Sequence, residues 1–155
     1  MAEKNYNMSN EHLYNVNISW KSERKGILSS PELVSQIEVA TPPQFPKGIE
    51  GIWSPEHLLV AAINSCLMTT FLAIADNSKL DFENFSSKAS GKLEMVDGKY
   101  LLTEVNLSPM VVIKKDQDKE RALRILEKSE AACLISNSVK SKIILIPSVT
   151  VDVGV

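Results

Sequence analysis

Residues 53–76, WSPEHLLVAAINSCLMTTFLAIAD, form one long apolar stretch that carries a thiol, Cys66, in its middle and a carboxylate, Glu56, near its start. Ser54 is a favourable N-cap, Pro55 suits the first helical position, and the charge of Glu56 suits the positive end of the helix dipole. We therefore expect a helix that starts at Ser54. Because its apolar residues point in nearly every direction, this helix must be enclosed on most of its sides.

A chain of 155 residues can hardly surround such a helix alone. We expect one domain over residues 1–155, with any disorder in the N-terminal residues 1–11. A second copy of the same helix would complete the enclosure, so we infer a homodimer with this helix at or near the interface. Residues 58–75 reach the lower limit of a membrane span, but polar residues interrupt them and no cationic flanks set an orientation. The stretch is therefore interpreted as a buried helix, with no membrane as a partner.

The net charge limits which partners the protein can bind, and the N-terminal residues indicate its cellular location. A formal net charge of -2 leaves no excess of cations to neutralise phosphates, so nucleic acid is not expected as a partner. Residues 1–12, MAEKNYNMSNEH, lack the apolar core of a secretory signal, which favours a cytoplasmic location. In that compartment the two cysteines are expected to be thiols or a redox pair rather than a permanent disulfide.

The pattern along the chain predicts a mixed architecture. Apolar residues alternate over residues 12–20 as in a half-buried strand, and residues 26–30 and 32–40 supply a second and a third strand of an antiparallel meander. After the helix, further strands are expected at 85–96, 99–108 and 110–115, with residues 96–99, VDGK, as a hairpin turn. A second helix within 116–134 ends close to Cys133, and a last strand over 143–153 has Pro147 at a bulge or an edge. This order of elements is α+β.

Cys66 and Cys133 are 67 residues apart, which excludes a C-x-x-C motif and a zinc knuckle, and the two histidines do not supply a metal site. A thiol buried in the middle of a helix should have a raised pKa and be unreactive unless a cation lies against it. The turn of residues 21–26, KSERKG, is the nearby segment richest in cations. We choose Arg24 as the activating cation because guanidinium can pair with a carboxylate while donating to a thiolate. Glu56 lies about 15 Å before Cys66 along the helix, so the two can meet only between antiparallel copies of the helix.

Cys133 suits a different role from Cys66. At the end of a helix it lies in a field that disfavours a thiolate, and a thiol that keeps its proton can resolve a sulfenic acid into a disulfide. Each candidate also has a plain structural interpretation: both cysteines as inert core thiols, Arg24 as a solvated turn residue, and Glu56 as an ordinary first-turn acid.

The sequence resembles the OsmC/Ohr family of thiol-dependent peroxidases. Residues 54–66, SPEHLLVAAINSC, are similar to that family's Asn/Ser-Pro-Glu-x-Leu helix leading to the peroxidatic cysteine. CLISNS at 133–138 is similar to its Cys-Pro-x-Ser motif, and ERKG at 23–26 is similar to a loop carrying Arg-x-Gly. The similarity spans roughly residues 12–153. Leu134 stands where the second motif usually has proline, and Ser54 and His57 stand where the hydroperoxide-specialised branch has Asn and Gln.

The resemblance implies an OsmC-like α+β fold: an intertwined homodimer in which two curved antiparallel sheets wrap central helices. It implies that Cys66 is the peroxidatic thiol, that Cys133 is the resolving thiol, and that Arg24 with Glu56 activates Cys66 and orients the peroxide. The expected reaction reduces organic hydroperoxides, and hydrogen peroxide with lower preference, through a Cys66 sulfenic acid and a Cys66–Cys133 disulfide. An external dithiol, such as the lipoylated proteins used by the Ohr branch, reopens this disulfide, and no cofactor or metal takes part.

Four side chains of the apolar helix are expected either to line the site, and so to favour organic substrates, or equally to be plain core: Leu59, Ile63, Leu67 and Phe71. Two alternatives remain open. One is a structural or small-ligand-binding dimer with little peroxidase turnover. The other is a cysteine acyl-transfer enzyme, in which His57 is the available general base but has the same problem of reach as Glu56.

Overall fold

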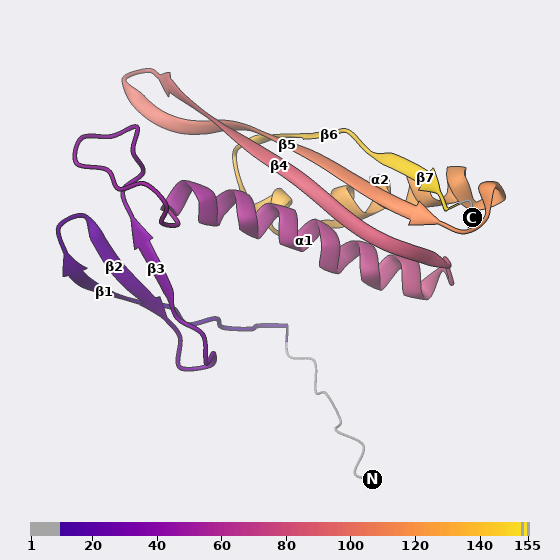
Figure 1. The fold of residues 1–155 in the computed structure, drawn as a ribbon, viewed down its shortest axis with the longest axis horizontal. Helices are drawn as coiled ribbons and strands as arrows, with labels where there is room; N and C mark the ends of the chain where they lie inside the picture. Colours follow the sequence, from indigo (N-terminus) through magenta and orange to yellow (C-terminus); the bar gives the residue numbers. More distant parts are fainter. Residues whose placement is uncertain (1–9, 153, 155) are drawn as a thin grey trace, which may run out of the picture. The chain divides into compact units, whose positions relative to one another are not determined.

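The computed structural model describes residues 10–152 and 154, so most of the predicted N-terminal disorder lies outside the described residues. The chain divides into a first unit, Met1–Pro55, and a second unit, Glu56–Val155. Each unit is described by itself, and the single domain expected over residues 1–155 stays a prediction. The mixed α+β composition is confirmed, since the structure contains two sheets and two long helices (Figure 1).

The first unit is a three-stranded antiparallel meander of β1 (Asn17–Ser22), β2 (Lys25–Ser29) and β3 (Ile37–Ala40), as predicted. The predicted strand boundaries are wrong at two places. β1 begins at Asn17 rather than at residue 12 and continues past Trp20, and it is exposed rather than half-buried, because this single layer has no second layer of its own. β3 begins only at Ile37, because Ser30 closes a turn in which its hydroxyl accepts a hydrogen bond from the N–H of Glu32 at 3.1 Å.

All of α1 (Pro55–Asn77) except its first residue belongs to the second unit, and its start directly after Ser54 confirms the predicted N-terminus. Two long antiparallel strands follow, β4 (Phe82–Val96) and β5 (Lys99–Ile113), joined at Asp97 and Gly98. Both turn residues have positive φ, 48° and 78°, which is the backbone of the tight hairpin turn that VDGK predicts. The rest of the unit comprises η1 (Asp116–Asp118), α2 (Lys119–Ala132), η2 (Ser136–Ser138), β6 (Lys142–Leu145) and β7 (Ser148–Val151).

The C-terminal half differs from the predicted strand count in two ways. β5 is one continuous strand through Pro109, where two strands were predicted, and the predicted last strand is divided into β6 and β7 around Ile146 and Pro147. A change of partner strand along β5 explains both differences. β5 pairs in parallel with β6 up to Leu107 and with β7 from Met110, so Pro109 lies where β5 passes from one partner to the other and a missing N–H costs least.

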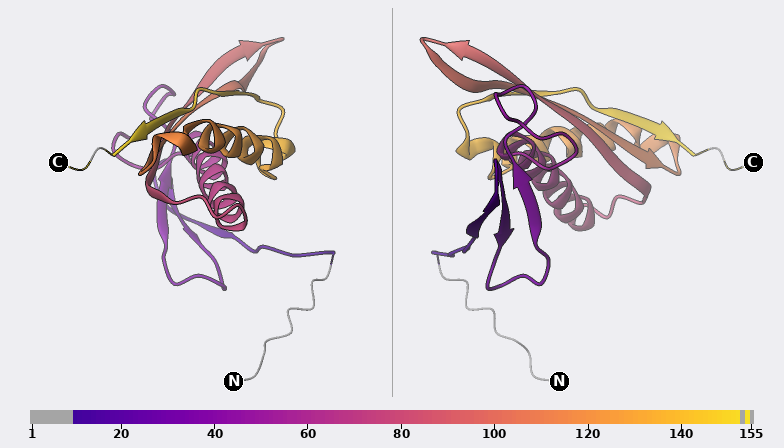
Figure 2. Two further views of the ribbon diagram at one scale, coloured as in Figure 1. Left: turned by 90° about the vertical axis from the view of Figure 1, so that its right-hand side faces the viewer. Right: turned by 60° about the vertical axis from the view of Figure 1, so that its left-hand side comes forward.

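Both helices of the second unit pack on one face of its sheet (Figure 2). Alternate residues of β5 face this layer and are buried, and the two core clusters join them to α1 and α2. On α1 every fourth residue is buried: Ile63, Leu67, Phe71 and Ala75.

The opposite face of α1 stays uncovered by the described residues of the second unit. Met68 and Leu72 are 39% and 41% exposed, so this unit alone does not enclose the helix on most sides, as the sequence predicts it must be. By length and composition alone α1 could cross a membrane, but its buried stripe belongs to the core of the second unit.

Candidate active site

The second unit brings Cys66 and Cys133 together. Cys66 lies in the middle of α1 and is half-buried, whereas Cys133 follows the last residue of α2 and is fully buried. Both are free thiols, and each lies near enough to the other to shift its pKa. Two residues 67 positions apart in the sequence therefore form one pair of sulfur atoms.

Neutral hydrogen-bond donors lower the pKa of Cys66 below its ordinary value. Burial is the largest single influence and raises this pKa, but the side chain of Cys133, the backbone N–H of Ile135, the hydroxyl of Thr70 and the backbone N–H of Leu134 together outweigh it. The Thr70 hydroxyl lies 3.9 Å from the sulfur, one turn further along α1. Sequence reasoning expected a cation to be necessary, whereas these donors are uncharged and come from the second unit itself.

The pKa of Cys133 is displaced in the opposite direction. Burial raises it, and its hydrogen bond with Cys66 raises it further, while the side chain and backbone of Ser136 act in the lowering direction without reversing the result. Cys66 is therefore the member of the pair that ionises first, while Cys133 keeps its proton to higher pH.

The turn after α2 fixes the position of Cys133. The helix ends because Cys133 is extended, at φ −64° and ψ 112°, while its N–H still donates to the carbonyl of Glu130 at 3.1 Å. Its own carbonyl accepts the N–H of Asn137 at 3.0 Å, and the side-chain amide of Asn137 donates to the carbonyl of Ala131 at 3.1 Å. The motif CLISNS thus supplies the thiol and also the residue that locks the backbone beside it.

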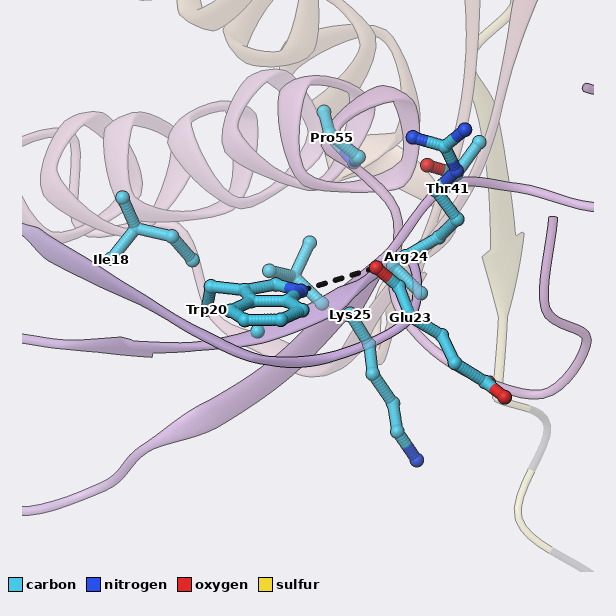
Figure 3. A pocket seen from close by; sticks show the side chains of 10 residues that line it. Ile18, Trp20, Glu23, Arg24, Lys25, Thr41 and Pro55 are labelled. Carbon is cyan, nitrogen blue, oxygen red and sulfur yellow. Dashed lines mark hydrogen bonds between the residues drawn. The ribbon is translucent and has the colours of Figure 1, made fainter. Parts of the chain in front are cut away.

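Arg24 lies in the turn between β1 and β2 of the first unit. Its carbonyl accepts the N–H of Thr41 at 3.1 Å, and its side chain extends toward Thr41 at the edge of a pocket of about 540 Å³ (Figure 3). On the other side of this pocket the indole N–H of Trp20 donates to the carbonyl of Glu23 at 3.1 Å. Gly26 is required here, because a Cβ would lie 2.6 Å from the carbonyl oxygen of Ser19 across the sheet.

Arg24 belongs to the first unit and Cys66 to the second, so the activating role predicted for Arg24 stays a prediction. Glu56 lies in the first turn of α1, where its Oε2 is buried and has no hydrogen-bond partner among the described residues. α1 is one unbroken helix, so Glu56 and His57 lie about 15 and 13 Å before Cys66 along its axis. Neither can reach the thiol of its own helix, so His57 cannot serve there as the general base that the acyl-transfer alternative requires.

Sequence reasoning missed the donors around Cys66. Thr70 lies four residues after Cys66, a spacing that places both on the same side of a helix and that the sequence does show. The N–H groups of Leu134 and Ile135 leave no trace in residue types, because every residue except proline carries one.

Residues 48–146 match the family model described as OsmC-like protein, which spans more than half of the chain. The chain belongs to the OsmC-like protein family. The resemblance read from residues 54–66 and 133–138 is thereby confirmed.

Individual relatives of this OsmC-like chain agree with the family. The uncharacterized protein YmaD of Bacillus subtilis is 25% identical over 152 residues, covering 95% of this chain and 99% of its own length. An OsmC-like protein of unknown function from Vibrio cholerae has a similar structure, with a TM-score of 0.80 at 24% identity, over 88% of this chain and 99% of that one. An organic hydroperoxide resistance protein from Elizabethkingia anophelis, with thiocyanate bound, gives a TM-score of 0.70 at 20% identity, over 92% and 99%. At these identities the solved structures show that the fold is shared.

Proposed function

We propose that this OsmC-like chain is a thiol-dependent peroxidase that reduces organic hydroperoxides through Cys66 and Cys133. One observation carries the proposal: each thiol acts on the pKa of the other, and the pKa of Cys66 is lowered while that of Cys133 is raised. A peroxidatic thiol must be ionised to attack, and a resolving thiol must wait in its protonated form. Membership of the family and a neighbour that is an organic hydroperoxide resistance protein support the same reaction class.

The proposed chemistry has three balanced steps. The Cys66 thiolate attacks one oxygen of ROOH, the O–O bond breaks, RO⁻ leaves and takes a proton to become ROH, and Cys66 becomes a sulfenic acid. The Cys133 thiol then attacks the sulfur of the sulfenic acid, which forms the Cys66–Cys133 disulfide and releases water. An external dithiol reduces this disulfide by exchange and is itself oxidised.

The preference for organic peroxides rests on the family relationship and not on the predicted apolar lining. Ile63, Leu67 and Phe71 are fully buried in the core clusters of the second unit, which agrees with the alternative that these side chains are plain core. Their i, i+4 spacing is the stripe that packs on the sheet, and this packing removes them from a substrate.

The remaining parts of the proposal concern groups outside the cysteine pair. Arg24 and Glu56 are proposed to pair with each other and to orient the peroxide, and the buried Oε2 of Glu56 is the kind of acceptor that needs such a cation. A homodimer is proposed because Met68 and Leu72 leave an apolar face of α1 uncovered, and because Glu56 can approach Cys66 only from another subunit. The enzyme is proposed to work in the cytoplasm with an external dithiol, such as a lipoylated protein.

The test is the rate of hydroperoxide reduction by the purified protein. Stopped-flow measurements with cumene hydroperoxide and dihydrolipoamide should show turnover in the wild type, none in Cys66→Ser, and a single oxidation without disulfide formation in Cys133→Ser. A slow reaction that is unchanged in Cys66→Ser would refute the peroxidase proposal and leave the ligand-binding dimer as the better description.

A further inference from the structure

We propose that Thr70 is a positioning residue for Cys66: its hydroxyl is reserved for the sulfur of Cys66, and the hydroxyl of Thr69 keeps it there by occupying the carbonyl of Cys66. The inference rests on the proposed function for its biological meaning, although its physical content concerns only the hydrogen bonds of Cys66 and the ionisation of its thiol.

A hydroxyl inside a helix normally turns back on the backbone of that helix. The side-chain oxygen of Ser or Thr can donate to the carbonyl three or four residues earlier, and this bond competes with any other use of the hydroxyl. The helices α1 and α2, which the structure describes in full, contain four such side chains, three in α1 and one in α2. Three of the four donate to a carbonyl of the preceding turn: Ser65 to Ala61 at 2.7 Å, Thr69 to Cys66 at 3.1 Å and Ser129 to Ile125 at 2.6 Å.

Thr70 is the exception among these four residues. Its hydroxyl oxygen lies 3.9 Å from Sγ of Cys66, at a spacing of four residues that places both side chains on one side of the helix. The carbonyl that Thr70 would otherwise use is that of Cys66, and this oxygen already has two donors. One is the N–H of Thr70 itself, through the helical hydrogen bond, and the other is the hydroxyl of Thr69. Because a carbonyl oxygen has two lone pairs, the hydroxyl of Thr70 is left to the sulfur.

Ionisation of Cys66 fixes the direction of this hydrogen bond. While the thiol is protonated, either the sulfur or the oxygen can be the donor. A thiolate has no hydrogen, so in the ionised state only the hydroxyl of Thr70 can donate. Both side chains are partly buried, and a donor to the charged form agrees with the lowered pKa of Cys66. Thr70 thereby holds the sulfur in place and favours the form that attacks a peroxide.

Four single variants separate the hydroxyl of Thr70 from the shape of its side chain. Thr70→Val replaces the hydroxyl by a methyl group, whereas Thr70→Ser keeps the hydroxyl. Ser65→Ala is the matched control, because it removes a hydroxyl next to Cys66 that is bonded to carbonyls of its own helix. Thr69→Val frees the carbonyl of Cys66 as an alternative acceptor for the hydroxyl of Thr70.

The measurement is the rate of iodoacetamide alkylation of the reduced protein as a function of pH, with mass spectrometry to assign the modification to Cys66. Loss of one hydrogen bond to the thiolate predicts a titration midpoint about 0.5–1 pH unit higher in Thr70→Val. The rate at high pH should be retained, because Cys66 is then fully ionised and equally accessible. Thr70→Ser and Ser65→Ala should keep the midpoint of the wild type.

Thr69→Val tests the second part of the proposal. It should raise the midpoint by less than Thr70→Val does, because the hydroxyl of Thr70 then divides its time between the carbonyl and the sulfur of Cys66. In the double variant Thr69→Val, Thr70→Val it should add nothing to the effect of Thr70→Val, because the hydroxyl that it redirects is absent.

The wild-type midpoint in a folded Thr70→Val variant would overturn the role of Thr70. An unchanged midpoint in Thr69→Val beside a raised one in Thr70→Val would overturn the role of Thr69. If circular dichroism shows that Thr70→Val does not fold, Thr70→Ala makes the same comparison with the residue that helices favour most. Alkylation needs no peroxide, so a raised midpoint in Thr70→Val of a protein without turnover would refute only the proposed function, while turnover with an unmoved midpoint would refute only this inference.

Discussion

At the scale of single residues, the two cysteines differ because their surroundings differ. The pKa of Cys66 is lowered by the thiol of Cys133, the hydroxyl of Thr70 and two backbone N–H groups, while Cys133 is fully buried and its pKa is raised. Burial alone would raise the pKa of both thiols, so the donors decide which of them becomes the nucleophile.

This difference predicts the pH dependence of alkylation. Because the pKa of Cys66 is lowered, its thiolate fraction, and with it the rate, should reach half-maximum below the pKa of a free cysteine, about 8.5. The alkylation rate therefore decreases as the pH falls through the titration midpoint of Cys66. Cys133→Ala removes a donor and should move the midpoint upward, whereas Ser90→Ala, an exposed change on β4, should leave it in place. A wild-type midpoint at or above that of free cysteine would contradict the arrangement of donors.

At the scale of elements, strand β4 packs closely against helix α1 at Gly91. A Cβ on Gly91 would lie 2.6 Å from Cγ2 of Val60 and 3.3 Å from Cδ2 of Leu102. Val60 cannot simply turn away, because its branched side chain has one strongly preferred rotamer in a helix. The strand therefore approaches the helix as closely as glycine allows.

Gly91→Ala should destabilise the protein by about 1–3 kcal/mol, because the added methyl overpacks the contact between β4 and α1. The double variant Gly91→Ala, Val60→Ala should recover part of the loss, which distinguishes a steric clash from an effect on the strand backbone. Urea denaturation followed by circular dichroism measures both. Equal losses for Gly91→Ala with and without Val60→Ala would show that the contact is not responsible.

Some features of the helices and strands could be predicted from the sequence, and others could not. The start of α1 followed from Ser54, Pro55 and Glu56, since caps and dipoles act locally. Two strands were predicted on either side of Pro109, but the change of partner strand at this position, which no local pattern encodes, accommodates the proline in one continuous β5. The pairing of Cys66 with Cys133 came from a resemblance, and the donors of residues 134 and 135 could not be predicted because peptide orientation is set by the folded turn.

At the scale of the whole molecule, the second unit leaves apolar side chains on α1 and on the far end of the β4–β5 hairpin in contact with solvent. These include Met68, Leu72, Leu93, Met95, Tyr100 and Leu101. Exposed apolar surface of this kind is typical of an interaction site, which agrees with the proposed homodimer.

The proposed dimer predicts a mass in solution of twice that of the chain, measured by size-exclusion chromatography with light scattering. Leu72→Lys places a charge on the uncovered face of α1 and should shift the protein toward the monomer, because a buried unpaired charge is costly. Asn77→Lys, an exposed change at the end of the same helix, should leave the dimer intact. A monomeric wild type at micromolar concentration would count against the dimer and against a role of Glu56 in trans.

The central claim is that Cys66 and Cys133 form one redox pair, and mass spectrometry tests it most directly. The reduced protein is treated with one equivalent of cumene hydroperoxide, digested without reductant and mapped. The account predicts an intrachain Cys66–Cys133 disulfide in the wild type and a sulfenic acid on Cys66, trapped by dimedone, in Cys133→Ser. Recovery of both cysteines as unmodified thiols after this treatment would contradict it.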